Sequence, residues 1–228
     1  MNKLLFLSIF FLIPAWAAST GITAADLLMR AEAGDRSAMR TLADGYYAGV
    51  DGLEQNFSKA AEWYRRLARS GDVRAQTSLG LMYARGYGVE KNMREAFRLW
   101  NFAALQNDPG AQFNLGVTYL QGEGVPPEAP RAAHWFREAA KRGHVQAQRN
   151  LALIYFHGNG VSRDLQQAYF WMKVAALQGD EDSAKSLEAI TSGLPPDQRD
   201  EAERQAQDWM SKNRRLEPQG NPGYPRSG

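Results

Sequence analysis

The residues best suited to chemistry are three histidines, because the chain contains no cysteine. His134, His144 and His157 are spaced too far apart for the i, i+4 arrangement in which one helix presents two histidines to a metal ion. We interpret His134 as an exposed helix residue. We interpret His157 as a residue at a helix C-terminus, where a protonated imidazole suits the helix dipole. The sequence therefore predicts no metal ion and no cofactor.

Motifs for nucleophilic catalysis are absent from the sequence. It has no Ser-x-x-Lys and no Gly-x-Ser-x-Gly, and its Gly-x-Gly turns lack the lysine of a phosphate-binding loop. Hydrolysis of a glycan would need two carboxylates at one site. Glu123 and Glu128 are expected on a loop with no evident pocket. We predict a protein that is not an enzyme. The alternative is a cell-wall or β-lactam-related envelope enzyme on the same fold.

One pattern of residues recurs four times at a nearly fixed step, beginning at Ala38, Ala75, Ala111 and Ala147. Each copy places Leu four residues and Tyr eight residues after the Ala, which puts all three on one stripe of a helix. The steps are 37, 36 and 36 residues. A period of this length is typical of a helical solenoid, which binds partners along an extended surface.

Each copy continues into a glycine-rich turn and a second helix. The paired glycines of the turn supply backbone angles that other residues resist. A small residue after the Leu (Gly80 and Gly116 in two copies) is expected to let a neighbouring backbone approach closely. The second helix buries an aromatic or large apolar residue in every copy. Gly or Asn then ends it in the left-handed conformation, and the four residues are Gly71, Asn107, Gly143 and Gly179.

The N-terminal segment has the features of a signal peptide. Lys3 precedes an apolar run over residues 4–13, Pro14 ends the run, and Ala15-Trp16-Ala17 supplies small residues where a signal peptidase reads. A membrane-spanning helix needs about 20 apolar residues, so the run is too short for one. We predict cleavage after Ala17 and a periplasmic or secreted protein with no membrane insertion after cleavage. The alternative is an uncleaved anchor.

The ends of the repeat array are expected to be shielded by extra helices. Thr23 is expected to cap a leading helix that buries Leu27, Leu28 and Ala31, and Asp197 to cap the final helix. Pro130 is expected at the first position of its helix. The predicted limits are a signal peptide over 1–17, a capping helix over 18–33, repeats over 34–70, 71–106, 107–142 and 143–178, a partial repeat with a capping helix over 179–215, and a disordered tail over 216–228.

These motifs resemble the Sel-one-like repeat family, a branch of the tetratricopeptide-like helical solenoids. The family repeat reads A-x-x-x-L-G-x-x-Y-x-x-G-x-G-V, then a short link, then K-A-x-x-W-F-x-x-A-A-x-x-G. Residues 75–88 and 111–124 match its first half, and 131–143 and 167–179 match its second. The chain departs from the pattern at Leu99, which replaces Trp, at Pro127-Glu128 in the link, and at Met172, which replaces an aromatic residue.

The resemblance implies an all-α fold, a right-handed α-solenoid of antiparallel helix pairs. It also implies an adaptor role, because members in bacterial envelopes look like adaptors in signalling, polysaccharide export or host contact. Some cysteine-rich exported members are associated with β-lactam binding, and their paired cysteines are absent here. We therefore expect an exported, non-catalytic scaffold for a protein partner, with a component of polysaccharide export or signalling as one candidate. The chain has 27 Lys and Arg against 25 Asp and Glu and no basic run, which argues against nucleic acid.

A partner is expected on the side of the first helix of each repeat that faces away from the Ala/Leu/Tyr stripe, which lines the concave surface in solenoids of this type. Aromatic, aliphatic and arginine residues there are the types enriched in interface hot spots. One alternative is that Leu81, Val117 and Leu153 pack between helices, and another is that the arginines are merely solvated. The predicted contact residues are Arg40, Tyr47, Arg85, Phe113, Leu120, Arg149 and Phe156.

Overall fold

The computed structural model describes residues 23–213, which form eleven helices and no strand. The predicted signal peptide and the predicted disordered tail lie outside these residues. A leading helix, α2 (Ala24–Glu32), precedes four helix pairs of 13 residues per helix and a final pair whose helices have 11 and 17 residues. We call the first helix of each pair helix A and the second helix B. The A helices are α3 (Arg36–Ala48), α5 (Val73–Arg85), α7 (Pro109–Gln121), α9 (Val145–His157) and α11 (Glu181–Thr191). The B helices are α4 (Phe57–Arg69), α6 (Met93–Leu105), α8 (Ala129–Lys141), α10 (Leu165–Leu177) and α12 (Pro196–Lys212).

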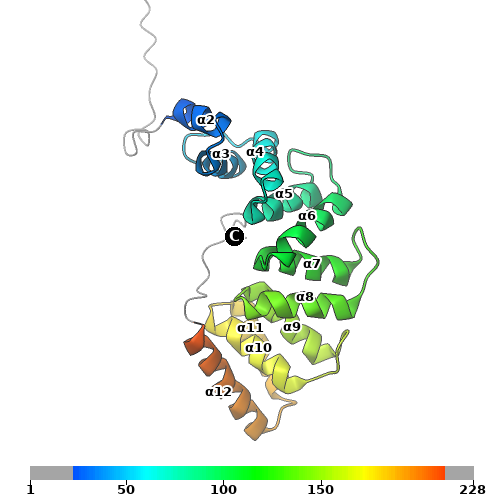
Figure 1. The fold of residues 1–228 in the computed structure, drawn as a ribbon. Coiled ribbons are helices and arrows are strands. Elements are labelled where there is room, and N and C mark those ends of the chain that lie inside the picture. The colour runs from blue at the N-terminus through cyan, green and yellow to red at the C-terminus, as the bar shows by residue number, and fades with distance from the viewer. Residues whose placement is uncertain (1–22, 214–228) are drawn as a thin grey trace, which may run out of the picture.

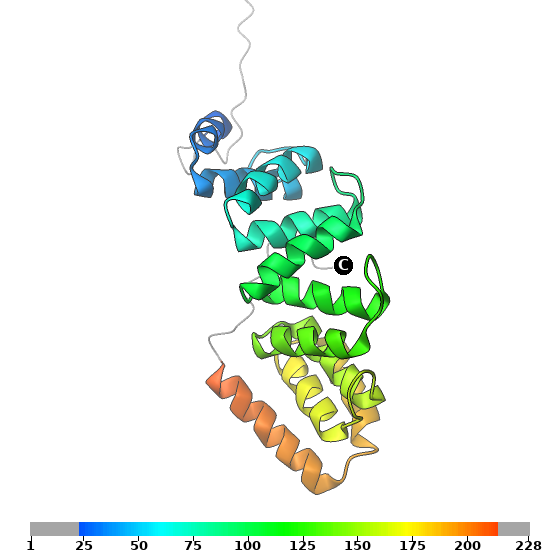
Figure 2. The ribbon, with the colours of Figure 1, turned by 45° about the vertical axis from the view of Figure 1, so that its right-hand side comes forward.

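Consecutive helices pack against each other from α2 to α11, so the chain builds a continuous curved array (Figure 1). The turned view shows the same stacking along the length of the molecule (Figure 2). The predicted all-α solenoid of antiparallel helix pairs is confirmed. Within residues 23–213, no helix is long and apolar enough to cross a membrane.

The repeated stripe of helix A lies in the core. The four leucines of the stripe are at most 3% exposed, and the four alanines before them are also buried. The tyrosines at the end of the stripe are less buried than the leucines. Tyr119 is buried, and the other three are half-buried. Removing each such leucine from water stabilises its repeat by roughly 2 kcal/mol. The leucines are Leu42, Leu79, Leu115 and Leu151.

In the second and third repeats, the glycine that follows the leucine makes room for an aromatic ring. A Cβ atom on Gly116 would lie 2.7 Å from the ring of Phe136, and one on Gly80 would lie 2.5 Å from Nε1 of Trp100. The prediction that a neighbouring backbone approaches here was therefore wrong in detail. The close neighbour is the aromatic side chain of helix B in the same repeat, which lies flat against the backbone of helix A.

Two separate constraints, a backbone angle and a close contact, require glycine at the second position of the Gly-x-Gly turns. Gly88 and Gly160 have φ values of +65° and +78°, in the left-handed region that favours glycine. A Cβ atom on either would also overlap the backbone at the start of the preceding helix B, at Phe57 and Ala129. Each of these turns therefore packs directly against the start of helix B in the preceding repeat.

The ends of the helices follow the predictions in most places. Thr23 and Asp26 form a reciprocal capping box at the start of α2. The four residues predicted to end the B helices all have positive φ, and they are Gly71, Asn107, Gly143 and Gly179.

Three local predictions were wrong. Leu28 is 44% exposed, because α2 has a neighbour on only one side and buries Leu27 and Ala31 instead. Pro130 is the second residue of α8, which begins at Ala129. Asp197 does not cap α12, since that helix begins at Pro196 and makes no side-chain capping bond.

A row of glutamines ties each helix A to the helix B before it. Gln76, Gln112 and Gln148 follow the repeat's Ala, and each donates from Nε2 to a backbone oxygen eight residues earlier, over 3.2–3.3 Å. In the first repeat this position is Met39. These buried hydrogen bonds fix the end of helix B against helix A. Sequence reasoning missed them, although Ala-Gln recurs in three repeats.

The final helix closes the array by packing on α10. Its face of Ala202 and Ala206 is fully buried, and Trp209 meets the ring of Trp171 edge-on at 6.2 Å. Glu203 forms an ion pair with Lys173 of α10 at 2.8 Å. The array therefore ends in an acidic helix laid over the outer face of a helix B.

Candidate functional site

Helix A contacts the next repeat through the residue two places after the repeat's Ala. That residue reaches the N-cap of the next helix A, and we call each such contact an inter-repeat pair. In the second repeat, Thr77 Oγ1 donates to a carboxylate oxygen of Asp108 over 2.9 Å. The four inter-repeat pairs are Arg40 with Asp72, Thr77 with Asp108, Phe113 with His144, and Arg149 with Asp180.

Two of the three arginines among the predicted contact residues, Arg40 and Arg149, are engaged in these pairs. Arg40 and Arg36 both form ion pairs with Asp72, whose side chain is 5% exposed. Arg149 Nη1 donates to the carboxylate of Asp180 over 3.1 Å and to Asp182 over 2.9 Å. Their charges are therefore largely balanced within the fold.

Phe113 is also engaged inside the protein. Its ring stacks on the imidazole of His144, with centroids 4.6 Å apart and planes 15° apart, and it lies 5.8 Å from the ring of Phe136. Phe113 therefore takes part in the packing between the third and fourth repeats. A helical wheel shows that Phe113 faces away from the core of its own repeat, but the next repeat lies on that side.

His144 was given no role from the sequence, although it replaces the Asp that caps helix A elsewhere. Its Nδ1 accepts the backbone N–H of Ala147 over 3.3 Å, as an N-cap does. Burial disfavours the imidazolium and lowers the pKa of His144 to about 4. Alignment of the repeats could have identified it, because Asp35, Asp72, Asp108 and Asp180 hold the same position.

Tyr47 and Phe156 are half-buried at the C-terminal ends of their helices. Tyr47 meets the ring of Phe57 edge-on at 5.4 Å. The guanidinium of Arg163 lies 5.8 Å from the ring centre of Phe156 and donates to its backbone oxygen over 3.0 Å. Both side chains are therefore partly open to solvent and partly packed against other residues of the protein.

Two of the predicted contact residues, Arg85 and Leu120, are exposed. Leu120 of α7 is 40% exposed, and Leu153 of α9 is 39% exposed. Leu81 and Val117 are half-buried, and Val117 packs against the core as the alternative had it, whereas Leu153 does not. The exposed apolar residues of helix A therefore lie in the third and fourth repeats.

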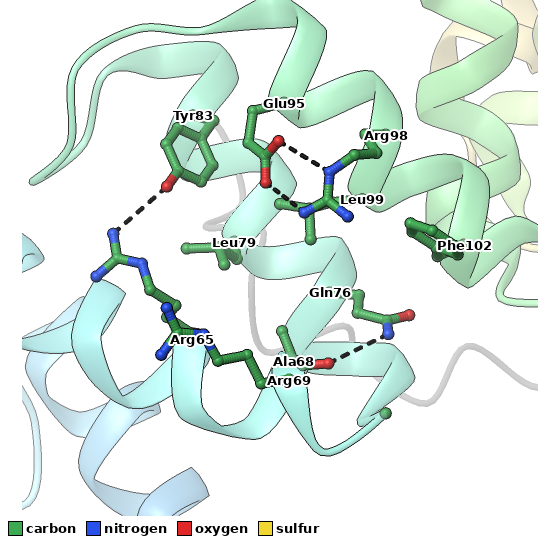
Figure 3. A pocket seen from close by; sticks show the side chains of 11 residues that line it. Arg65, Ala68, Arg69, Gln76, Leu79, Tyr83, Glu95, Arg98, Leu99 and Phe102 are labelled. Carbon is green, nitrogen blue, oxygen red and sulfur yellow. Dashed lines mark hydrogen bonds and ion pairs between the residues drawn. The ribbon is translucent and has the colours of Figure 1, made fainter.

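A pocket of about 440 Å³ lies elsewhere, between α4, α5 and α6 (Figure 3). Arginines of α4 and α6 form its walls, with apolar side chains between them, and none of the predicted contact residues lines it. The side chains that line it include Arg65, Arg69, Leu79, Tyr83, Glu95, Arg98, Leu99 and Phe102.

The arginines of this pocket differ in how far they are engaged. Arg98 donates two hydrogen bonds to Glu95, over 2.9 and 2.5 Å, and holds the pKa of that carboxyl below its usual range. Arg65 donates to the hydroxyl of Tyr83 over 3.4 Å. Three arginines against one carboxylate leave an excess of positive charge. A carboxyl held ionised by a bidentate arginine is a poor general acid.

Within residues 23–213, no three His, Cys, Asp or Glu side chains gather closely enough to hold a metal ion. His134 and His157 are both exposed, and His157 is the last residue of α9. The described part of the chain therefore offers surfaces and one basic pocket for binding.

Comparison with known proteins agrees with this arrangement. The model of the Sel1 repeat matches residues 36–72, 73–108, 109–144 and 145–180, which make up more than half of the chain. The chain belongs to the Sel1 repeat family. Each matched segment begins two residues later than the repeat limits predicted from the sequence, and the step is the same.

Two solved structures extend the comparison. A protective antigen present in uropathogenic Escherichia coli strains, which displays an SLR fold, is 32% identical with a TM-score of 0.78, and the match covers 90% of this chain. The chain spans only 44% of that protein's length. A Sel1 repeat protein from Oxalobacter formigenes is 30% identical with a TM-score of 0.67, and the match covers 84% of this chain and 78% of that one. No curated protein matches the chain.

Membership of the family indicates a general kind of activity. Sel1 repeat proteins generally mediate protein–protein interaction and are generally scaffolds rather than enzymes. Because one fold can carry many functions, the particular partner has to be argued from surfaces of this chain.

Proposed function

We propose that this Sel1 repeat protein is an exported, non-catalytic scaffold that holds a protein partner on the outward face of helix A. Its setting is the bacterial cell envelope, in signalling, assembly or polysaccharide machinery. The supporting observation is the exposure of Leu120 and Leu153 on the A helices of consecutive repeats. A partner that spans adjacent units of a solenoid can cover aliphatic residues that are open to water on each unit.

The inter-repeat pairs support this role in a second way. They hold consecutive A helices in a fixed relation without any ligand, so the face that bears Leu120 and Leu153 is preorganised. A preorganised surface loses little conformational entropy when a partner binds. Arg85 adds an exposed charge at the end of α5.

Export is supported by the apolar run over residues 4–13 and by Ala15-Trp16-Ala17. The absence of cysteine fits a chain whose stability rests on packing between repeats. The Escherichia coli relative is a protective antigen, which fits an exported protein. Intact-mass measurement of the periplasmic or secreted protein should give a chain that begins at Ala18. Recovery of the full-length chain in the membrane fraction would contradict this.

The helix-A face can be tested by site-specific photocrosslinking in living cells. A photoreactive phenylalanine analogue at position 120 or 153 should form a defined adduct with one protein. The same analogue at Leu177, which is 44% exposed on helix B, is the matched control and should not form it. If positions 120 and 153 give no adduct, or give the same adducts as position 177, the helix-A face is not the binding surface.

A further inference from the structure

The pocket between α4, α5 and α6 exists at the repeat that departs from the common pattern. Leu99 of α6 lines it, and the equivalent residues of the other repeats are Trp63, Trp135 and Trp171. Those tryptophans fill the space between helices, with Trp63 and Trp171 buried and Trp135 packed against two core clusters. A leucine is smaller than an indole, so the second repeat retains an open volume of about 440 Å³.

The walls of this pocket combine positive charge with apolar surface. Arg65 and Arg69 lie one turn apart on α4, and Figure 3 shows Leu79 between them and α6. Arg69 has no hydrogen bond or ion pair with the described part of the chain. Phe102 is 48% exposed at the edge of the pocket, and Leu105 is 67% exposed one turn further along α6. A ligand here would need a carboxylate close to an apolar group.

The far end of the array shows how such a face is covered. Lys173 of α10 is the equivalent of Arg65, three repeats further along. It forms an ion pair with Glu203 of α12 at 2.8 Å, while Trp209 of α12 lies edge-on to Trp171. The chain therefore covers the helix-B face of its fourth repeat with an acidic amphipathic helix of its own. No described segment covers α4 and α6 in that way.

We propose that the pocket formed by Arg65, Arg69, Leu79, Leu99 and Phe102 binds an acidic amphipathic helix of a protein partner. A carboxylate of that helix lies between Arg65 and Arg69, and an apolar side chain enters the space beside Leu99. The arginines and Phe102 of this site lie on B helices, and its helix-A residue Leu79 belongs to the buried stripe, so the site is separate from the outward helix-A face proposed above. It rests on the proposed function only in that the ligand is a protein.

The test uses a synthetic peptide with the sequence of residues 196–212, which carries Glu203 and Trp209, as a defined acidic helix. The ¹⁵N-labelled protein is titrated with this peptide and with its Glu203→Gln twin, and amide shifts are followed by NMR. We expect saturable shifts in α4 and α6, and binding about threefold weaker for the twin, as for loss of one solvent-exposed ion pair. Shifts confined to α9–α12, or equal affinity for both peptides, would overturn the proposal.

Two variants of the protein sharpen the result. Leu99→Trp restores the residue of the other repeats and should weaken binding about tenfold or more by filling the pocket. Arg69→Glu should abolish binding. Because Arg69 is exposed, this variant should fold, so it tests the proposal even if Leu99→Trp does not fold. Leu120→Ser on the helix-A face should bind the peptide as the wild type does, so failure of this site is distinguishable from failure of the helix-A face. Wild-type affinity in Leu99→Trp, or equally tight binding of N-acetylglutamate alone, would refute a helix-binding pocket.

Discussion

His144 makes the stability of the third inter-repeat junction depend on pH. Its imidazole is the N-cap of α9 and accepts a hydrogen bond from Ala147, while Phe113 covers one ring face. The lone pair that accepts this bond is lost on protonation. The positive end of the helix dipole also disfavours a cation at this position. We therefore expect protonation of His144 to weaken the docking of α9.

The magnitude follows from the pKa of His144, which is about 4 in the folded protein against an ordinary value of 6.5. Well above pH 6.5 the residue is neutral in both states and contributes no pH dependence. Between pH 6.5 and 4 the unfolded chain binds the proton first, so the free energy of unfolding falls as the pH is lowered. The total loss is about 3 kcal/mol, of which about 2 kcal/mol is reached by pH 5. Because water reaches part of the ring, these values are upper bounds.

The assay is urea unfolding of the wild type and His144→Asn, followed by circular dichroism at several pH values between 7.5 and 4.5. Asparagine is a good N-cap that does not titrate in this range. The variant should lose less stability than the wild type as the pH falls, which separates His144 from the carboxylates that titrate in both proteins. His134→Asn, at an exposed histidine, is the matched control and should follow the wild type. If the curves of the wild type and His144→Asn remain parallel, the imidazole is not a neutral cap and the reasoning is refuted.

Three further predictions test the packing between helices. Gly116→Ala should lower the free energy of unfolding by about 1–3 kcal/mol, since its Cβ would lie 2.7 Å from Phe136; an unchanged melting temperature would show that the ring moves freely. Gln148→Met should cost about 1–3 kcal/mol, because two buried hydrogen bonds are lost, and urea unfolding measures it. A chain ending at Pro196 should melt at a lower temperature than the full chain, because it exposes the face of α10 that α12 covers; equal melting temperatures would rule out a capping role.

The sequence was sufficient to predict the solenoid because local and global signals coincide in every repeat. The Ala/Leu/Tyr stripe sets the buried face of helix A, and turn glycines such as Gly88 fix both the backbone angle and the approach of the preceding repeat. These features depend on residues within one repeat or its immediate neighbour. A fixed step of 36 residues therefore defines the helices almost to the residue.

The contact residues were harder to predict because a helical wheel describes a single helix. Phe113 and Arg149 face away from their own core, yet the N-cap of the following helix A occupies that side. The signal that could have revealed this is the pairing of residue types 31–32 positions apart, in which an arginine is matched by Asp and the single phenylalanine by His144. The exposure of Leu153 also depends on how tightly successive repeats stack, which the sequence of one repeat does not determine.

The position of the pocket was already marked in the sequence by Leu99, but only as a departure in packing. A solenoid must cover the outer face of its last helix B, and α12 does so with Glu203 and Ala202. The fold does not require an opening in the second repeat, because a Trp in place of Leu99 would fill the space and would match the repeat pattern. An opening that the fold does not require, bordered by an arginine without a partner in residues 23–213, points to a ligand rather than to a packing defect. The two proposed sites have no lining residue in common, because Leu120 and Leu153 lie on α7 and α9 while the pocket is lined by α4, α5 and α6, so a single chain can hold two partners at once.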